Sequence, residues 1–212
     1  MNLLAGLLPR AARWAEAGVD DIGEAGASLT PAERVAMSSW APSRQREFAL
    51  GRLCARRALL QLGAVAEVAV GPRREPLWPV GFVGAISHQD DLAMAAVARA
   101  SDLAGLGIDL ARHAPLPEGV LKQVATAGEC VWIERDVMSI HWDTVVFSAK
   151  ESLYKAISAT VGRLVDFHEA TLDRAGDELR VRGVVAGVFG ERLTLRHGVR
   201  GAFVVTTATL GW

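Results

Sequence analysis

Residues 147–155 (FSAKESLYK) constrain this chain most, because they place three charged side chains in a helix that is otherwise apolar. A helix that starts near Asp143 carries Glu151 and Lys155 four residues apart, on one face. Its remaining surface is apolar, with Val146, Leu153, Ala156 and Ile157. A buried charge costs several kcal/mol, roughly, unless a cation or metal ion neutralises it. The ordinary alternative is a solvated Glu–Lys pair, worth about 0.3 to 0.5 kcal/mol.

The composition is typical of a globular protein, with 212 residues, half of them hydrophobic, and a net charge of −1. This charge gives no general argument for a nucleic-acid or membrane partner, so we expect neither. Cys54 and Cys130 are far apart in apolar, helix-like contexts, which suits core residues in a reducing compartment. The opening residues 1–8 have no basic leader and are followed by Pro9, so we expect a cytoplasmic location.

Local signals mark the starts and ends of several elements. Capping boxes predict helix starts at Thr30 and Thr126, each with Glu three residues later. A longer helix is predicted over residues 43–62, ending at Gly63. Strand-like runs cover residues 82–87, 92–97 and 103–110, and their short connections favour an antiparallel meander. Later strands are expected near residues 167–173, 178–181, 193–195 and 202–210.

Both halves of the chain therefore place helices first and antiparallel strands afterwards. This order predicts an α+β fold made of two similar halves, residues 1–108 and 109–212, with the active site between them. Since two similar halves in one chain remove the need for a second copy, we expect a monomer.

Asp109 stands near the end of a strand-like run in which glycines leave room for a close approach. One interpretation is a turn residue whose carboxylate caps a backbone amide. The other is a magnesium ligand paired with Glu151, because magnesium is held by one or two carboxylates while substrate phosphates and waters complete its shell. The second interpretation requires a substrate that carries phosphate.

The first half of the chain is rich in residues suited to phosphate. Arginine makes forked, permanently charged contacts with phosphate oxygens, and histidine donates from its ring nitrogens. The candidates are Arg44, Arg52, Arg73, Arg74, Ser87 and His88. The alternative is that the arginines pair with acids such as Glu33, Glu47 and Glu75, and that His88 is a turn residue.

The paired motifs GID (residues 107–109) and FSAKESLYK (147–155) resemble the signature of the 4'-phosphopantetheinyl transferases of the surfactin-synthetase-activating and enterobactin type. Further segments resemble other blocks of this family in order and spacing. They are RLCAR (52–56), EPLWPVG (75–81), GAISH (84–88) and HWD (141–143). The resemblance covers roughly residues 30–173.

The resemblance implies transfer of the phosphopantetheine arm of coenzyme A to a serine of an apo acyl or peptidyl carrier protein, with release of adenosine 3',5'-bisphosphate. It also implies that coenzyme A binds between two pseudo-twofold halves. Asp109 and Glu151 would hold Mg²⁺, Glu151 would also deprotonate the serine, and Lys155 would contact the phosphates. The nucleotide end would be held by Arg44, Arg52, Arg73 or Arg74, Ser87 and His88.

The chain departs from the family at one position that matters for the metal. Many members carry a second acid two residues after the aspartate, where this chain has Ala111. A water or the Leu110 carbonyl would then complete the coordination. A non-catalytic coenzyme A or nucleotide binder and a magnesium-dependent phosphohydrolase are the alternative functions. Carrier proteins of polyketide, nonribosomal peptide, siderophore and fatty acid pathways all stay open as partners.

Overall fold

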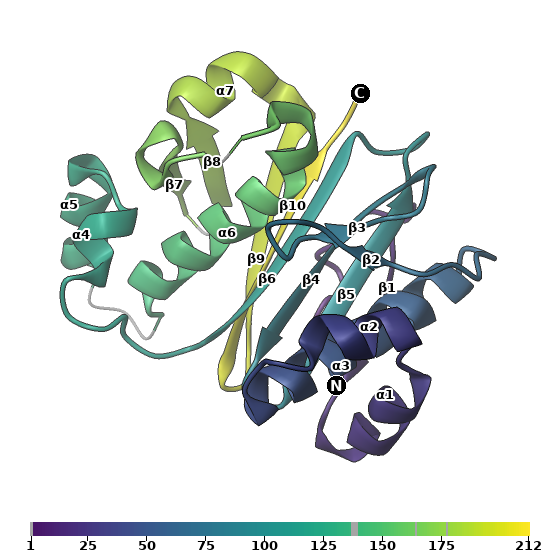
Figure 1. Ribbon diagram of the computed structural model, residues 1–212. Coiled ribbons are helices and arrows are strands. Elements are labelled where there is room, and N and C mark those ends of the chain that lie inside the picture. Colours follow the sequence, from purple (N-terminus) through teal and green to yellow (C-terminus); the bar gives the residue numbers. More distant parts are fainter. Residues whose placement is uncertain (1, 137–139, 164, 177) are drawn as a thin grey trace.

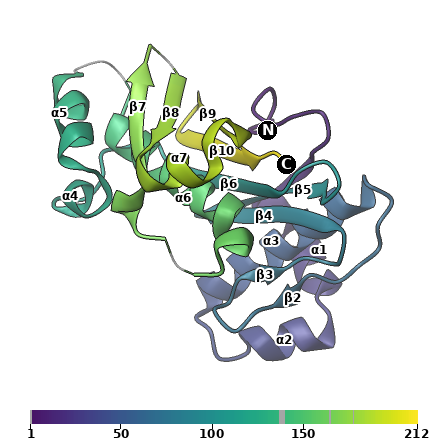
Figure 2. The same cartoon turned by 90° about the horizontal axis from the view of Figure 1, so that it is seen from above.

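The computed structural model describes residues 2–136, 140–163, 165–176 and 178–212 of the chain. It is an α+β structure in which the helices α1 to α3 and α4 to α7 gather around different parts of a central set of strands (Figures 1 and 2). The helices are α1 (Ile22–Ser28), α2 (Pro31–Met37), α3 (Pro42–Leu60), α4 (Val120–Val124), α5 (Ala127–Arg135), α6 (Trp142–Val161) and α7 (Gly183–Phe189). Within the described part of the chain, no helix is long and apolar enough to cross a membrane.

The strands form two three-stranded antiparallel sheets and two small hairpins. The strands are β1 (Arg13–Ala17), β2 (Ala69–Val70), β3 (Pro76–Leu77), β4 (Phe82–Gln89), β5 (Leu92–Arg99), β6 (Gly105–Arg112), β7 (Thr171–Ala175), β8 (Glu178–Arg182), β9 (Leu193–Arg200) and β10 (Phe203–Leu210). The first sheet has the order β1-β5-β4 and the second has the order β6-β10-β9, while β2 pairs with β3 and β7 with β8.

Each three-stranded sheet packs against one long helix. Helix α3 buries Leu50 and Cys54 against Ala93 and Ala95 of β5. Helix α6 buries Val145 and other apolar residues against Val204 of β10. This repeated arrangement confirms the predicted α+β fold of two similar halves. The predicted boundary between residues 108 and 109 falls inside β6, so the exact division of the chain stays a prediction.

The predicted helices agree with the structure. Thr30 and Thr126 each accept a hydrogen bond from the backbone of the glutamate three residues later, as a capping box requires. Gly63 follows α3 with a φ of 76°, a left-handed conformation that glycine adopts without strain. The predicted start of α6 near Asp143 differs by one residue from the observed start.

The predicted three-stranded meander is only half right. Strands β4 and β5 pair antiparallel, but β6 pairs with β10 and belongs to the other sheet. The reason is that β1, which the sequence patterns did not predict, occupies the second edge of β5. Farther along, the run expected to be a strand from residue 167 begins with a short 3-10 helix, Phe167–Glu169, and α7 was not predicted at all.

Strand β6 lies unusually close to α6, and two glycines permit this approach. Leu106, Ile108 and Leu110 point into a core shared with β5, so the alternating residues Gly105 and Gly107 face α6. A Cβ atom on Gly107 would lie 1.8 Å from the Ser152 carbonyl oxygen, and one on Gly105 would lie 2.0 Å from that of Ala156. Only a residue without a side chain fits at either position.

We expect Gly107→Ala to lower the free energy of unfolding by about 3 kcal/mol, because the new methyl group meets helix backbone that cannot rotate away. Urea denaturation followed by circular dichroism measures this change. Gly128→Ala in α5 is the matched control, since its Cβ has no atom within 4 Å and alanine favours a helix by about 1 kcal/mol. Equal effects of the two substitutions would contradict the steric explanation.

Candidate active site

Asp109 lies on β6 with its side chain almost fully buried, and it accepts two hydrogen bonds at the same oxygen. Lys155 Nζ donates to Asp109 Oδ1 over 2.7 Å, and Ser87 Oγ donates to it over 3.0 Å. Lys155 also donates to the Ile108 carbonyl over 3.1 Å. Residues from β4, β6 and α6, which belong to both halves of the chain, therefore converge on one carboxylate.

Glu151 lies one helical turn before Lys155 on α6 and is half-buried. Burial raises the pKa of its carboxyl, the Asp109 charge raises it further, and Lys155 opposes both by lowering it. The two carboxylates therefore interact electrostatically, with one lysine to balance them. This combination confirms the charged face that the sequence predicted for α6.

The donor set at this site consists of hard oxygen atoms, which suit Mg²⁺ better than a softer metal ion. Among the described residues, the site has two carboxylates and no third. This agrees with the alanine at position 111, where many members of the resembling family carry a second acid; Ala111 is buried within β6 opposite Val204. Across the described ranges, no group of three or more His, Cys, Asp or Glu side chains is placed to hold a metal ion. The metal roles of Asp109, Glu151 and the Leu110 carbonyl stay predictions.

His88 follows Ser87 on β4 and contacts residues at the start of α3. An Arg44 N–H group contacts His88 Nε2, and Glu47 Oε2 lies 3.5 Å from His88 Nδ1 and 3.0 Å from Arg44 Nη1. Burial lowers the pKa of His88, with a smaller opposing effect from Glu47.

Trp40, which the sequence patterns did not single out, lies between two of the predicted phosphate-binding arginines. The guanidinium carbons of Arg44 and Arg74 lie 5.9 and 5.1 Å from the centre of its rings. Arg73, in the same loop as Arg74, is exposed, and its Nε lies 3.8 Å from Glu75 Oε1. The expected pairing of arginines with Glu47 and Glu75 is therefore found, and it leaves the three guanidinium groups partly open to solvent.

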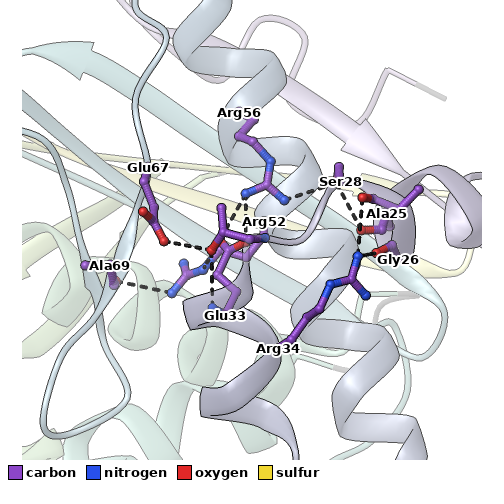
Figure 3. Close-up of polar contacts among 11 residues, drawn as sticks. Ala25, Gly26, Ser28, Glu33, Arg34, Arg52, Arg56, Glu67 and Ala69 are labelled. Atoms are coloured by element: carbon purple, nitrogen blue, oxygen red, sulfur yellow. Dashed lines mark hydrogen bonds and ion pairs between the residues drawn. The ribbon is translucent and has the colours of Figure 1, made fainter.

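The structure does not bring Arg52 to this group of residues. Its guanidinium is buried beside Glu33, at 3.6 Å, and donates to the Ala69 carbonyl over 3.3 Å (Figure 3). Arg56 forms two hydrogen bonds with the same Glu33 carboxylate. Burial lowers the pKa of Arg52 to about 10, against the opposing effect of Glu33. These contacts support a structural role for Arg52, and its predicted role with phosphate has no support from this geometry.

A cavity of about 490 Å³ lies where the two halves meet. Its wall combines Trp78 and Phe82 with Gly105 of β6 and with Lys155 and Ser158 of α6. The indole N–H of Trp78 is buried and has no hydrogen-bond partner in the described structure.

Lys150, the third charge of the helix, has a role that the sequence did not predict. Its side chain is fully buried, and Nζ donates to Glu129 Oε2 and to the carbonyls of Val124 and Phe167, all within 3 Å. Burial lowers the pKa of Lys150, while the hydrogen bond to Glu129 opposes this shift. The sequence indicated only the capping box at Thr126, which positions Glu129. It did not indicate that Lys150 also binds this glutamate.

Two family models match the chain. The model of the 4'-phosphopantetheinyl transferase N-terminal domain matches residues 32–98, and that of the 4'-phosphopantetheinyl transferase superfamily matches residues 105–207. The second match contains Asp109, Glu151 and Lys155, and the first contains Arg44, Arg73 and His88.

Several curated relatives are similar to this chain over half or more of their length. The 4'-phosphopantetheinyl transferase Svp of Streptomyces mobaraensis is 38% identical, over 94% of this chain and 79% of the relative. The chain matches 65% of the transferase PptT of Mycobacterium tuberculosis at 35% identity, and half of the enterobactin synthase component D of Salmonella typhi at 32%. A holo-[acyl-carrier-protein] synthase structure from Thermotoga maritima has a TM-score of 0.44 and 16% identity, with 51% of this chain and 64% of that chain covered.

The two family models and the 38% identical relative Svp show that this chain is a transferase enzyme. The chain belongs to the 4'-phosphopantetheinyl transferase superfamily, whose members transfer phosphopantetheine from coenzyme A to carrier proteins.

We expect Lys150→Met to lower the free energy of unfolding by about 3 to 5 kcal/mol, because it leaves the Glu129 charge buried without its partner. Chemical denaturation measures the loss. Lys122→Met on the exposed side of α4 provides the control, with a change within about 0.5 kcal/mol. A loss for Lys150→Met no larger than that of the control would show that the buried pair adds nothing.

Replacement of Glu151 by Gln should raise the melting temperature of the free protein at pH 7. A raised pKa means that the fold disfavours the charged carboxylate, so the penalty is complete above the raised pKa and absent below the ordinary value of 4.5. The gain from Glu151→Gln should therefore disappear as the pH falls below 4.5. Thermal scans from pH 4 to 8 test this, with Glu118→Gln on the exposed surface as the control. A gain that does not change with pH would rule out this cause.

Proposed function

We propose that this chain transfers the 4'-phosphopantetheine arm of coenzyme A to a serine of apo acyl or peptidyl carrier proteins in a Mg²⁺-dependent reaction that releases adenosine 3',5'-bisphosphate. The observation that carries the proposal is the convergence of Asp109, Glu151 and Lys155 beside a cavity between the two halves. Membership of the superfamily supports the reaction class. The metal, the product and the residue roles are our proposal.

Coenzyme A fits the cavity and its surroundings by chemistry. The apolar wall with Trp78 and Phe82 suits the uncharged part of the molecule, and Lys155 provides a cation at its edge. Arg44 and Arg74 lie around Trp40, His88 contacts Arg44, and these residues offer donors for the phosphates of the nucleotide end. Arg73 borders the cavity itself and extends this positive region.

Asp109 and Glu151 are the residues that would hold Mg²⁺, which when bound neutralises charge on the pyrophosphate oxygens. In the free protein Lys155 forms an ion pair with Asp109, so the two carboxylates Asp109 and Glu151 have one lysine between them, and burial is the main cause of the raised pKa of Glu151. An incoming cation therefore finds a site with excess negative charge.

Glu151 is also the group best suited to remove the proton from the attacking serine. Burial raises its pKa above the ordinary value, with Lys155 opposing and the Asp109 charge adding to the shift, which makes it a stronger base than an exposed glutamate. Lys155 would stabilise the negative charge of the departing phosphate oxygen. A unit charge pair about 4 Å apart in such a partly shielded site is worth on the order of 4 kcal/mol, against about 1 kcal/mol in bulk water.

Intact-mass spectrometry of apo carrier proteins tests the proposal directly. With coenzyme A and Mg²⁺, the wild-type chain should add phosphopantetheine to at least one acyl or peptidyl carrier. Asp109→Ala and Glu151→Ala should each slow the transfer by about 100-fold or more, since each removes a charge used in the reaction. Asp20→Ala, at an exposed acid of the first half, should leave the rate unchanged.

The same assay separates the alternative functions. A phosphohydrolase would release phosphopantetheine from coenzyme A without a carrier protein, and a non-catalytic binder would bind coenzyme A and form no product. Either result, or a wild-type rate retained by Asp109→Ala and Glu151→Ala, would refute the proposed transfer.

A further inference from the structure

Ser87 lies where the two three-stranded sheets meet, between strands β4 and β6, which do not pair with each other. It lies on β4 of the first sheet, while its neighbours Asp109 and Leu110 lie on β6 of the second sheet. Ser87 Oγ donates to Asp109 Oδ1 over 3.0 Å and accepts from the Leu110 N–H over 3.1 Å. Its side chain therefore takes the place of a strand-to-strand hydrogen bond at the position where the two halves meet.

The hydrogen-bonding capacity of this hydroxyl is already used. A serine hydroxyl has one donor and two acceptor sites. The donor is directed to Asp109, one acceptor site takes the Leu110 N–H, and Lys155 Nζ lies 3.4 Å from the same oxygen. Ser87 is also 5% exposed. It therefore has neither the free donor nor the exposure that contact with a nucleotide phosphate requires.

The same contacts fix the orientation of the Asp109 carboxylate. Ser87 and Lys155 both donate to Oδ1 of Asp109. No residue in the described part of the chain donates to Oδ2. The carboxylate group is thus held from one side, with Oδ2 as the oxygen that remains for a ligand. Lys155 has a long stem with several rotatable bonds, whereas Ser87 is a short side chain on a strand, so Ser87 is the more rigid of the two supports.

We propose that Ser87 is a positioning residue that orients Asp109 for a divalent cation, in contrast to a contact with the nucleotide end of coenzyme A. The proposal rests on the proposed function, in which Asp109 is a metal ligand. His88, the next residue on β4, makes its contacts with Arg44 and Glu47, and in this proposal it is the residue of the pair that contacts the nucleotide end.

Binding of Mn²⁺, a paramagnetic substitute for Mg²⁺, tests the proposal without reference to turnover. In the presence of coenzyme A, Ser87→Ala should weaken Mn²⁺ binding measured by electron paramagnetic resonance by about 10- to 100-fold, as the loss of a group that orients a metal ligand does. The affinity for coenzyme A in EDTA, measured by calorimetry, should stay within about 2-fold of the wild type, because no contact with the nucleotide is lost.

Two further variants make the test specific. Ser87→Cys keeps the volume but supplies a weaker donor, so it should weaken Mn²⁺ binding less than Ser87→Ala, and it replaces that variant if Ser87→Ala does not fold. Ser152→Ala on α6 is the matched control, because the Ser152 hydroxyl is buried and, among the described residues, bonds only to the Ala149 carbonyl of its own helix. It should bind Mn²⁺ as the wild type does.

Unchanged Mn²⁺ affinity in Ser87→Ala, no Mn²⁺ binding by the wild type, or a loss of coenzyme A affinity in EDTA would each overturn the positioning role. Failure of the proposed function has a different result, since it appears as the absence of phosphopantetheine on every carrier protein treated with the wild type. The difference in Mn²⁺ affinity between Ser87→Ala and Ser152→Ala is measured independently of that result.

Discussion

The close contact between β6 and α6 is the constraint on which the site depends. Gly105 and Gly107 allow the helix backbone to lie where the Cβ atoms of any other residues would be. This contact brings Asp109, two residues beyond Gly107, within hydrogen-bond distance of Lys155, three residues beyond Ser152. A carboxylate and an ammonium group so far apart in the chain meet because two strand residues have no side chain.

The three charges of residues 147–155 have different environments on one helix. Lys150 points into the protein. It joins α6 to α5 through Glu129, to α4 through the Val124 carbonyl, and to the segment after α6 through the Phe167 carbonyl. Glu151 and Lys155 lie toward the junction of the halves, where their charges interact with Asp109. Successive residues on a helix point about 100° apart, so neighbouring charges can serve stability and chemistry separately.

The arginines of the first half could be predicted from the sequence as a group, but their individual environments could not. Residue type indicated a phosphate-binding set, and the structure does place Arg44 and Arg74 around Trp40. It places Arg52, on the same helix as Arg44, inside the protein with Glu33. The difference depends on α2, whose Glu33 side chain contacts Arg52 and Arg56 of α3. No local pattern around Arg52 carries that information, because it concerns how two helices pack.

The sequence by itself determined the elements whose signals are local. The capping boxes at Thr30 and Thr126, the hairpin of β4 and β5, and the amphipathic α6 each depend on residues within a few positions of one another. Only the tertiary structure decided that β1 pairs with β5 and β6 with β10, that Ser87 contacts Asp109, and that Lys150 is buried. These outcomes depend on which surfaces compete for the same strand edge or core position, and that competition is settled by packing across the whole chain.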